Sequence, residues 1–332
     1  MFRQDRVRST LALALLVAGA VYAYSASYFG KELLAEIAVF AILAMSLDFL
    51  AGFAGLVTLG HAAFYGAGAY VYAVLTVNHG VAAGFAMLAA AAVCAIAGWL
   101  IGAVTYRVRG IFLIMATLAF GQMSYVYIFE NRALGGDDGM SGVPRVDLSA
   151  VGIDLSNSAN FAFTLVLIAG LTYVLFAWLL SSGFGQALVG MQRNEQRMRA
   201  LGLPVLRYKA AAFAIAGAIA GMAGTLGAQH NMFVSPDYLH WTTSGLVLVL
   251  VILGGLESLA GPALGAAVVI ALKHEISTYT VHWAFFIGVF LIVAVLAGGR
   301  GLYGLIDVAV RRFSRSKSPE PHDGDDRRQG DA

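Results

Sequence analysis

Long runs of apolar residues, separated by short polar or glycine-containing breaks, make up most of this 332-residue chain. The runs are continuous rather than alternating, which favours membrane-spanning helices over the strands of a β-barrel. A helix needs about 20 apolar residues to cross the hydrocarbon of a bilayer. We therefore predict an all-α polytopic membrane protein with about ten transmembrane helices, near residues 9–28, 32–51, 60–78, 81–106, 110–129, 160–181, 210–230, 243–257, 259–275 and 282–299.

A polar, largely basic segment at residues 182–209 interrupts this pattern. If residues 186–201 form a helix, four apolar side chains fall on one stripe, because residues three or four positions apart share a helix face. Glycine and proline then end the helix, and an acidic and a basic residue lie one turn apart in the stabilising order. We predict a short amphipathic helix whose stripe faces either lipid headgroups or a partner protein. The stripe is Leu188, Met191, Met198 and Leu201, the helix stop is Gly202 with Pro204, and the charge pair is Glu195 with Arg199.

A glycine-rich stretch between Leu47 and Tyr70 does not suit one uniform helix. Each glycine in a helix interior costs about 1 kcal/mol relative to alanine. In lipid, an interrupted backbone is tolerated only where protein or a water-filled cavity surrounds it. We predict a broken helix here, which lines a solute pathway or makes a close helix contact. The tentative pathway residues are Asp48, Gly52, Gly55, Gly60 and His61, the two ionisable ones because such groups are costly inside a membrane.

Further glycine patterns predict close helix contacts rather than a ligand site. The G-x-x-x-G spacing occurs at Gly217–Gly221 and at Gly261–Gly265. Small residues at this spacing let two helix backbones approach each other in a membrane. Breaks at Gly254-Gly255 and Gly261-Pro262 also divide one long apolar stretch into the last two spans before residue 276.

Composition and charge support the membrane assignment and give an orientation. Hydrophobic residues make up 59% of the chain and charged residues 12%, whereas soluble domains carry about 25% charged residues. Cytoplasmic loops of membrane proteins retain Lys and Arg. With an even number of spans and the N-terminus inside, the cytoplasmic side holds all of the 21 Lys and Arg residues except Lys31, Arg132, Arg145 and Lys273. We therefore predict that both ends of the chain are cytoplasmic.

This topology sets the predicted regions of the chain. Residues 1–8 are a cytoplasmic N-terminus, residues 9–300 the transmembrane domain, and residues 301–332 a cytoplasmic tail that is charged and disordered at its end. Within the domain, residues 131–159 form an external loop. The segment 23–27 contains small residues that would also suit signal-peptide cleavage, but the apolar run before it is long for that purpose, so we predict a retained first span.

The chain lacks the sequence motifs of ATP hydrolysis and of common metal and hydrolase sites. It contains no G-x-x-x-x-G-K-[ST] phosphate loop, so this chain is not expected to hydrolyse ATP. It also contains no H-E-x-x-H, no zinc-spaced Cys/His pair and no G-x-S-x-G. We predict no enzyme activity, no catalytic residue, no metal site and no nucleic-acid partner.

Four stretches of the chain combine into a specific pattern. They are Gly52–Tyr70; Arg109–Met123 with Gly135–Gly142; Arg193–Glu195 with Ala200–Gly202 and Arg207–Lys209; and Ser235–Asp237 with Gly254–Pro262. Together they resemble the permeases of branched-chain amino-acid ABC transporters, of the LivM type. The resemblance covers most of the chain, from about Glu36 to Gly301.

The resemblance implies a permease subunit of an ABC importer that moves branched-chain amino acids across the cell inner membrane. Such permeases pair with a second, related permease, sit on two cytoplasmic ATPase subunits that hold ATP and Mg, and receive substrate from a periplasmic binding protein. This chain itself would bind no cofactor. The helix at 186–202 would be the coupling helix, docked in a groove of the ATPase. The residues implied in coupling are Gly190, Arg193, Asn194, Glu195, Arg199, Leu201, Gly202, Arg207, Tyr208 and Lys209.

Two residues depart from the resembled pattern. Asp48 stands where Asn is expected in many relatives, and Glu257 stands where Gly is frequent. Three interpretations of an acid at either position stay open: it alters the pathway, it binds a cation, or it is a variation that the fold tolerates. Permeases for urea, amides and other amino acids look similar in these stretches, so they are the alternative substrates. The alternative from another class is an ATP-independent channel or secondary carrier, in which Asp48 would carry protons.

Overall fold

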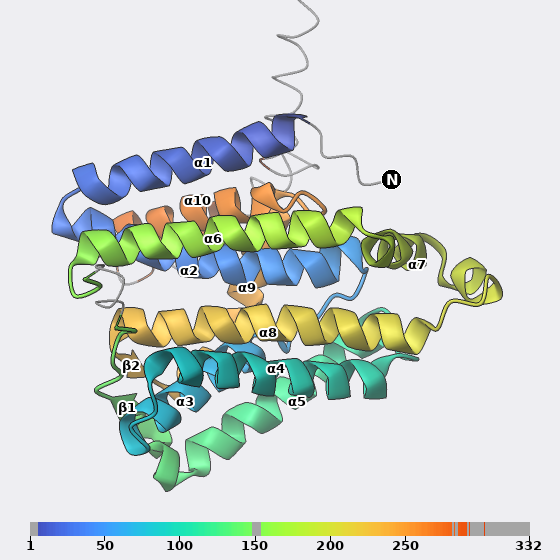
Figure 1. Ribbon diagram of the computed structural model, residues 1–332, viewed down its shortest axis with the longest axis horizontal. Coiled ribbons are helices and arrows are strands. Elements are labelled where there is room, and N and C mark those ends of the chain that lie inside the picture. The colour runs from blue at the N-terminus through green and yellow to red at the C-terminus, as the bar shows by residue number, and fades with distance from the viewer. Residues whose placement is uncertain are drawn as a thin grey trace, which may run out of the picture.

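The computed structural model describes residues 6–147, 154–280, 282, 285–290, 292 and 302. Helices account for most of this part of the chain (Figure 1). They are α1 (Arg6–Ser25), α2 (Tyr28–Asp48), α3 (His61–Ala73), α4 (Ala83–Thr105), α5 (Ile111–Glu130), α6 (Ser158–Ser181), α7 (Gly183–Ala200), α8 (Val205–Asn231), α9 (Trp241–Gly254) and α10 (Ala260–Tyr279). The prediction of a helical protein is confirmed for the described part of the chain, which is nearly all helical.

The long helices lie stacked across the bundle, with α7 at one end (Figure 1). A small antiparallel sheet of β1 (Met140–Ser141) and β2 (Phe233–Val234) lies at the opposite end. Met140 pairs with Val234, which ties the predicted external loop to the connector after α8. Two 3-10 turns, Arg132–Leu134 and Gly136–Asp138, precede β1.

Five helical segments in the described part of the chain are long and apolar enough to cross a bilayer. Two shorter ones, Thr10–Ser25 and Trp241–Gly254, are also apolar. These helices support a membrane protein, but a count of ten spans and cytoplasmic ends are not confirmed. More than half of the predicted span 282–299, residues 1–5 and nearly all of the tail fall outside the described residues. The five segments are Tyr28–Phe53, Ala83–Thr105, Ile111–Glu130, Ser158–Ser181 and Val205–Asn231.

The predicted glycine face of α8 is confirmed as a contact surface. A Cβ atom at Gly221 would lie 2.5 Å from the Cys94 sulfur of α4. A Cβ atom at Gly224 would meet the backbone carbonyl oxygen of Tyr65 on α3. These positions let α8 approach α3 and α4 at backbone distance, and glycine is the residue without a side chain to prevent it.

The segments on either side of Gly255 are separate helices, α9 and α10. They pack against each other through Gly265, where a Cβ atom would meet the Leu250 carbonyl oxygen. The break at Gly254-Gly255 is therefore confirmed. The second predicted break is wrong, because Gly261-Pro262 lies in the first turn of α10, where proline is tolerated since the N–H groups have no helical partner.

The glycine-rich stretch is broken as predicted. α2 ends at Asp48 and passes into a π-helical turn, Phe49–Phe53. The chain is then non-helical until α3 begins at His61. Gly55 lies within this break at φ +68°, a backbone conformation that glycine adopts without a steric penalty.

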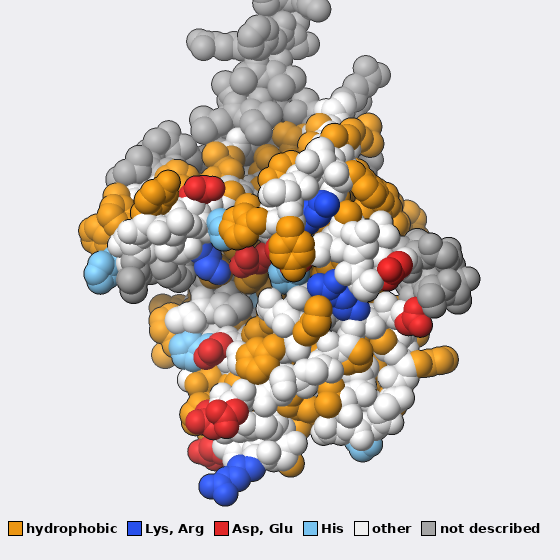
Figure 2. All heavy atoms as spheres, turned by 90° about the vertical axis from the view of Figure 1, so that its left-hand side faces the viewer, with side chains coloured by type: hydrophobic (Ala, Val, Ile, Leu, Met, Phe, Trp, Pro, Cys, Tyr) orange, Lys and Arg blue, Asp and Glu red, His pale blue; other side chains and the backbone are white. Residues whose placement is uncertain are grey.

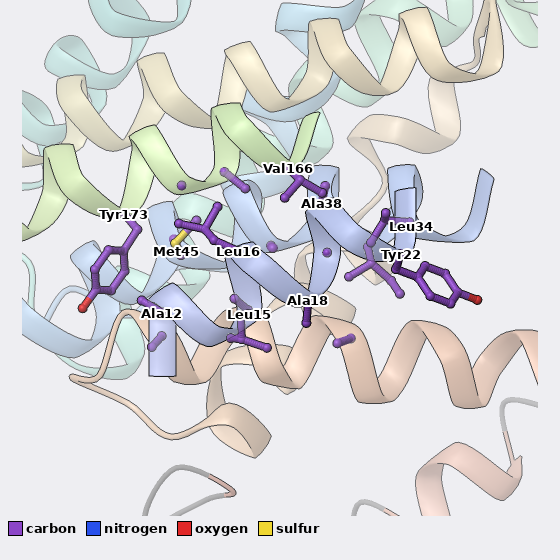
Figure 3. A pocket seen from close by; sticks show the side chains of 18 residues that line it. Ala12, Leu15, Leu16, Ala18, Tyr22, Leu34, Ala38, Met45, Val166 and Tyr173 are labelled. Atoms are coloured by element: carbon purple, nitrogen blue, oxygen red, sulfur yellow. The ribbon is translucent and has the colours of Figure 1, made fainter. Parts of the chain in front are cut away.

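An apolar cavity of about 320 Å³ lies beside α1. Its wall combines small and aliphatic side chains of α1, α2, α6 and α10, while Tyr22 and Tyr173 lie at its two ends (Figure 3). α1 therefore covers the bundle incompletely at this edge.

Candidate functional site

α7 is bent, and the bend occurs at Asn194. This residue has φ −156° and ψ 91°, which is extended rather than helical backbone. Its side-chain oxygen accepts a hydrogen bond from the Arg197 backbone N–H at 2.9 Å. Asparagine favours this capping arrangement because it satisfies an N–H that has no helical partner. The prediction of one continuous helix over residues 186–201 is therefore wrong.

The bend brings the second piece of α7 back toward the first. A Cβ atom at Gly190 would lie 2.7 Å from Met198 Cε. Leu188 and Met191 are buried, with 1% and 6% of their surface exposed, whereas Leu201 is 72% exposed. The single apolar stripe is thus also wrong, since its first half packs into the protein and its last member lies on the surface.

Glu195 follows the bend and is surrounded by three cations. Its carboxylate lies 2.8 Å from Arg109, 2.9 Å from Arg199 and 3.1 Å from Lys209. Lys209 also donates a hydrogen bond to the Tyr106 carbonyl oxygen. The predicted Glu195–Arg199 pair is confirmed, and the larger cluster joins α7 to α8 and to the link between α4 and α5.

The cluster keeps Glu195 ionised. Burial alone would raise the pKa of its carboxyl group, but the hydrogen bonds and charges of Lys209 and Arg109 outweigh that effect and lower the pKa below its ordinary value. A carboxylate is favoured wherever cations lie within hydrogen-bond distance. The cluster therefore holds its negative centre at neutral pH.

The other residues implied in coupling divide between packing and surface. The Tyr208 ring stacks on Phe184, with ring centroids 5.4 Å apart, which fixes α7 to the start of α8. Gly202 has φ +84° and follows the last turn of α7, so the predicted helix stop is confirmed. Arg193 and Arg207 are exposed. Together with Leu201 they are part of the accessible surface of this end of the molecule.

Gln192 links α7 to both breaks in the helical bundle. Its side-chain NH₂ donates hydrogen bonds to the Gly52 carbonyl oxygen at 2.5 Å and to a Glu257 carboxylate oxygen at 2.8 Å. Gly52 lies in the π-helical turn after α2, and Glu257 lies between α9 and α10. Gln192 and Arg109 are not among the residues predicted for coupling, because neither belongs to an apolar stripe or a local charge pair.

Asp48 is buried beneath the same region. One carboxylate oxygen accepts a hydrogen bond from the Glu257 N–H at 2.9 Å, and the other accepts one from the Leu259 N–H at 3.0 Å. Both donors have positive φ angles, +62° and +56°. His61 is also buried, and its Nε2 atom lies 2.7 Å from the Ser46 hydroxyl. The side chains of these two tentative pathway residues are thus engaged within the fold.

Gly52 and Gly60 are required by close contacts. A Cβ atom at Gly52 would meet an Asp48 carboxylate oxygen, and one at Gly60 would meet the Thr117 carbonyl oxygen of α5. The break in the glycine-rich stretch is therefore tightly enclosed by protein, apart from Gly55, which is exposed beside Gln192.

Comparison with known proteins identifies the family. Residues 30–296 match the family described as the permease component of the branched-chain amino acid transport system. The chain belongs to this permease family. No solved structure matches the permease described above.

Curated relatives carry the same description. The permease is 30% identical over 314 residues to the high-affinity branched-chain amino acid transport system permease protein LivM of Salmonella typhimurium, an alignment that covers 87% of this chain and 73% of the relative. It is 29% identical to LivM of Escherichia coli over the same shares of each chain. A probable LivM of Methanocaldococcus jannaschii is 26% identical over 213 residues, 61% of this chain and 60% of that relative. These relatives are transport permeases rather than enzymes.

Proposed function

We propose that this chain is the permease subunit of an ABC importer that moves branched-chain amino acids inward across the cell inner membrane. The observation that carries the proposal is the family match over residues 30–296, supported by LivM relatives that align with 87% of the chain. The sequence has no phosphate loop, so ATP and Mg²⁺ belong to two partner ATPase subunits in this scheme. A second, related permease and a periplasmic binding protein complete the transporter.

In this proposal α7 is the part that the ATPases move. Its exposed end, with Arg193 and the adjoining Leu201, docks on the ATPase surface together with Arg207 of α8. This surface is on the cytoplasmic side, where both chain ends also lie. Glu195 joins that end rigidly to α8, and Gln192 joins it to the two helix breaks. Closure of the ATPase dimer therefore reaches the transmembrane helices through short polar contacts. The spans then alternate between two arrangements, as in other rocking transporters.

The residues of the glycine-rich break have a supporting part in the pathway. Asp48 and His61 are held by internal hydrogen bonds, so we assign them to the shape of the pathway wall rather than to solute contact. Gly52, Gly55 and Gly60 give the break the close contacts it needs, and they let the backbone bend where α7 touches it.

Transport by the complete complex in liposomes tests the proposal. Leucine, isoleucine and valine are expected to enter only when ATP is present on the side of the membrane that carries the ATPases and the binding protein is present on the opposite side. Other amino acids and urea, offered in the same assay, are expected to enter more slowly. Uptake that a proton gradient drives without any ATPase would replace the proposal with a secondary carrier.

A charge exchange tests the coupling assignment. In Glu195→Lys with Arg199→Glu, the pair attracts as before, but the new lysine lies beside Arg109 and Lys209. We expect insertion to continue while ATP hydrolysis no longer drives uptake. Arg132→Glu, exposed near the β1 end of the molecule, is the control and should transport normally. Unchanged coupling in the exchanged variant would remove α7 from the mechanism.

A further inference from the structure

A second cavity, with charged residues in its wall, lies at the end of the bundle that carries β1 and β2, away from α7. Its volume is about 320 Å³, at the lower end of the roughly 300–1,000 Å³ found for small-molecule sites. α2, α8, α9 and α10 contribute to its wall, together with the connector after β2. In Figure 2, which faces this end, acidic, basic and histidine side chains meet near the middle of the face.

One part of the wall carries both signs of charge. Lys273 Nζ lies 3.3 Å from a Glu36 carboxylate oxygen, and each side chain is 32% exposed. Asp237 adds another carboxylate to the wall, and His230 adds an imidazole whose Nδ1 lies 3.4 Å from Glu32. A charge pair that water reaches contributes little to stability. The Lys273–Glu36 pair can therefore open at low cost and accept new partners.

The rest of the wall is largely apolar or aromatic. Val39 and Phe40 of α2 and Leu246 of α9 face the cavity, and Tyr238 stacks on Tyr65 with ring centroids 5.2 Å apart. Ligand sites commonly combine such apolar walls with a few polar groups that orient the ligand. This cavity thus suits a small ligand that has both charges and an apolar side chain.

From this arrangement we propose that the cavity binds the transported solute as a zwitterion, on the side of the membrane away from the ATPases. The inference rests on the proposed function and adds the solute's contacts. Lys273 pairs with the ligand carboxylate, Glu36 pairs with its ammonium group, and Val39, Phe40 and Leu246 contact a branched side chain. Each charge of the opened pair gains a partner of opposite sign, so no charge is left unbalanced. Urea offers neither charge and lacks the apolar part.

Cysteine protection in the complete complex, held in lipid nanodiscs, tests the site. Thr243 lines the cavity, and Thr243→Cys is labelled with a maleimide, while the native Cys94 is buried. Leucine at about ten times its dissociation constant should slow labelling about tenfold, because only about one site in eleven then remains free to react. 4-Methylpentanoate and 3-methylbutylamine each carry one of the two charges and should protect much less.

Ser277→Cys, exposed on α10, is the control and should label equally with and without leucine. Ser235→Cys replaces Thr243→Cys if the latter does not assemble.

The charged pair is tested in the Thr243→Cys background. Lys273→Gln and Glu36→Gln are each expected to remove the leucine protection at that concentration. Lys31→Gln and Glu275→Gln are matched controls on the same two helices, outside the cavity wall. Both control variants should retain the protection by leucine.

The outcomes separate this inference from the proposed function, because labelling needs no ATP. Leucine that leaves labelling unchanged, or protection that survives both cavity substitutions, overturns the inference. A complex that takes up leucine yet shows no protection overturns the cavity assignment alone. A complex that takes up no leucine overturns the proposed substrate. Labelling of Thr243→Cys with and without leucine then still decides whether the cavity binds leucine.

Discussion

Asp48 and Leu259 are 211 positions apart in the chain, yet the Asp48 carboxylate accepts a hydrogen bond from the Leu259 backbone N–H at 3.0 Å. The same carboxylate accepts the Glu257 N–H. A single buried acid thus holds the turn between α9 and α10 against the end of α2. This geometry assigns Asp48 a structural task and favours that reading over proton transport.

Removal of this acid should destabilise the permease. Asp48→Ala leaves the buried Leu259 N–H and the partly buried Glu257 N–H without this partner, and a buried N–H group without a partner costs about 1–3 kcal/mol. Asp48→Asn keeps one acceptor oxygen and should be affected less. Thermal melting of the purified protein in detergent gives the comparison. Equal melting temperatures for wild type and Asp48→Ala would show that the turn does not depend on the carboxylate.

Glu257 carries a backbone strain that its replacement should reveal. Its φ of +62° costs a residue with a Cβ atom about 1–2 kcal/mol. Glu257→Gly and Glu257→Ala both delete the carboxylate, but glycine also relieves the strain. We expect Glu257→Gly to melt at a higher temperature than Glu257→Ala. The reverse order would contradict a strained turn.

The sequence predicted the helices well, because continuous apolar runs define membrane helices directly. The predicted span 160–181 corresponds to Ser158–Ser181, and 81–106 corresponds to Ala83–Thr105. Local charge spacing also placed Glu195 beside Arg199. These successes concern residues within about four positions of one another or runs of one chemical type.

The contacts between distant residues could not be read in the same way. The bend at Asn194 escaped prediction, because the apolar spacing of residues 186–201 fits a straight helix. Gln192 and Lys273 belong to no local pattern, and their partners Glu257 and Glu36 lie 65 and 237 positions away. Such pairs follow from how the helices pack, which periodicity does not report.

The glycine face of α8 should be intolerant of a methyl group. Gly224→Ala places a Cβ against the Tyr65 carbonyl oxygen, a rigid backbone atom, and overpacking of this kind costs about 1–3 kcal/mol. Gly245→Ala on α9 is the control, since a Cβ there has no atom within 4 Å in the described structure. It should be neutral or stabilising by about 1 kcal/mol. Melting temperatures that fall equally in both variants would contradict the packing argument.

The Glu195 cluster should make stability depend on pH. The pKa of Glu195 is lowered in the folded protein, so its contribution is present above the unfolded-state pKa and is lost as pH falls through the folded-state pKa. The melting-temperature difference between wild type and Glu195→Gln should therefore be largest near neutral pH and shrink in acid. Added salt should also reduce it, because the cluster is partly exposed. A difference that grows on acidification would contradict the assigned charge state.

Gln192 should carry motion from α7 to the helix breaks. Gln192→Ala removes hydrogen bonds to Gly52 and Glu257, each worth about 0.5–1.5 kcal/mol. Because about 1.4 kcal/mol changes a population ratio tenfold, each lost bond lowers the population of the coupled arrangement by up to about tenfold. We expect ATP hydrolysis to continue while leucine uptake per ATP falls. Gln186→Ala is the matched control, because Gln186 also lies on α7 but bonds to the nearby Ser181 carbonyl oxygen. The ratio of uptake to hydrolysis in the reconstituted complex decides the matter, and an unchanged ratio in Gln192→Ala would mean that movement reaches the bundle through the Glu195 cluster instead.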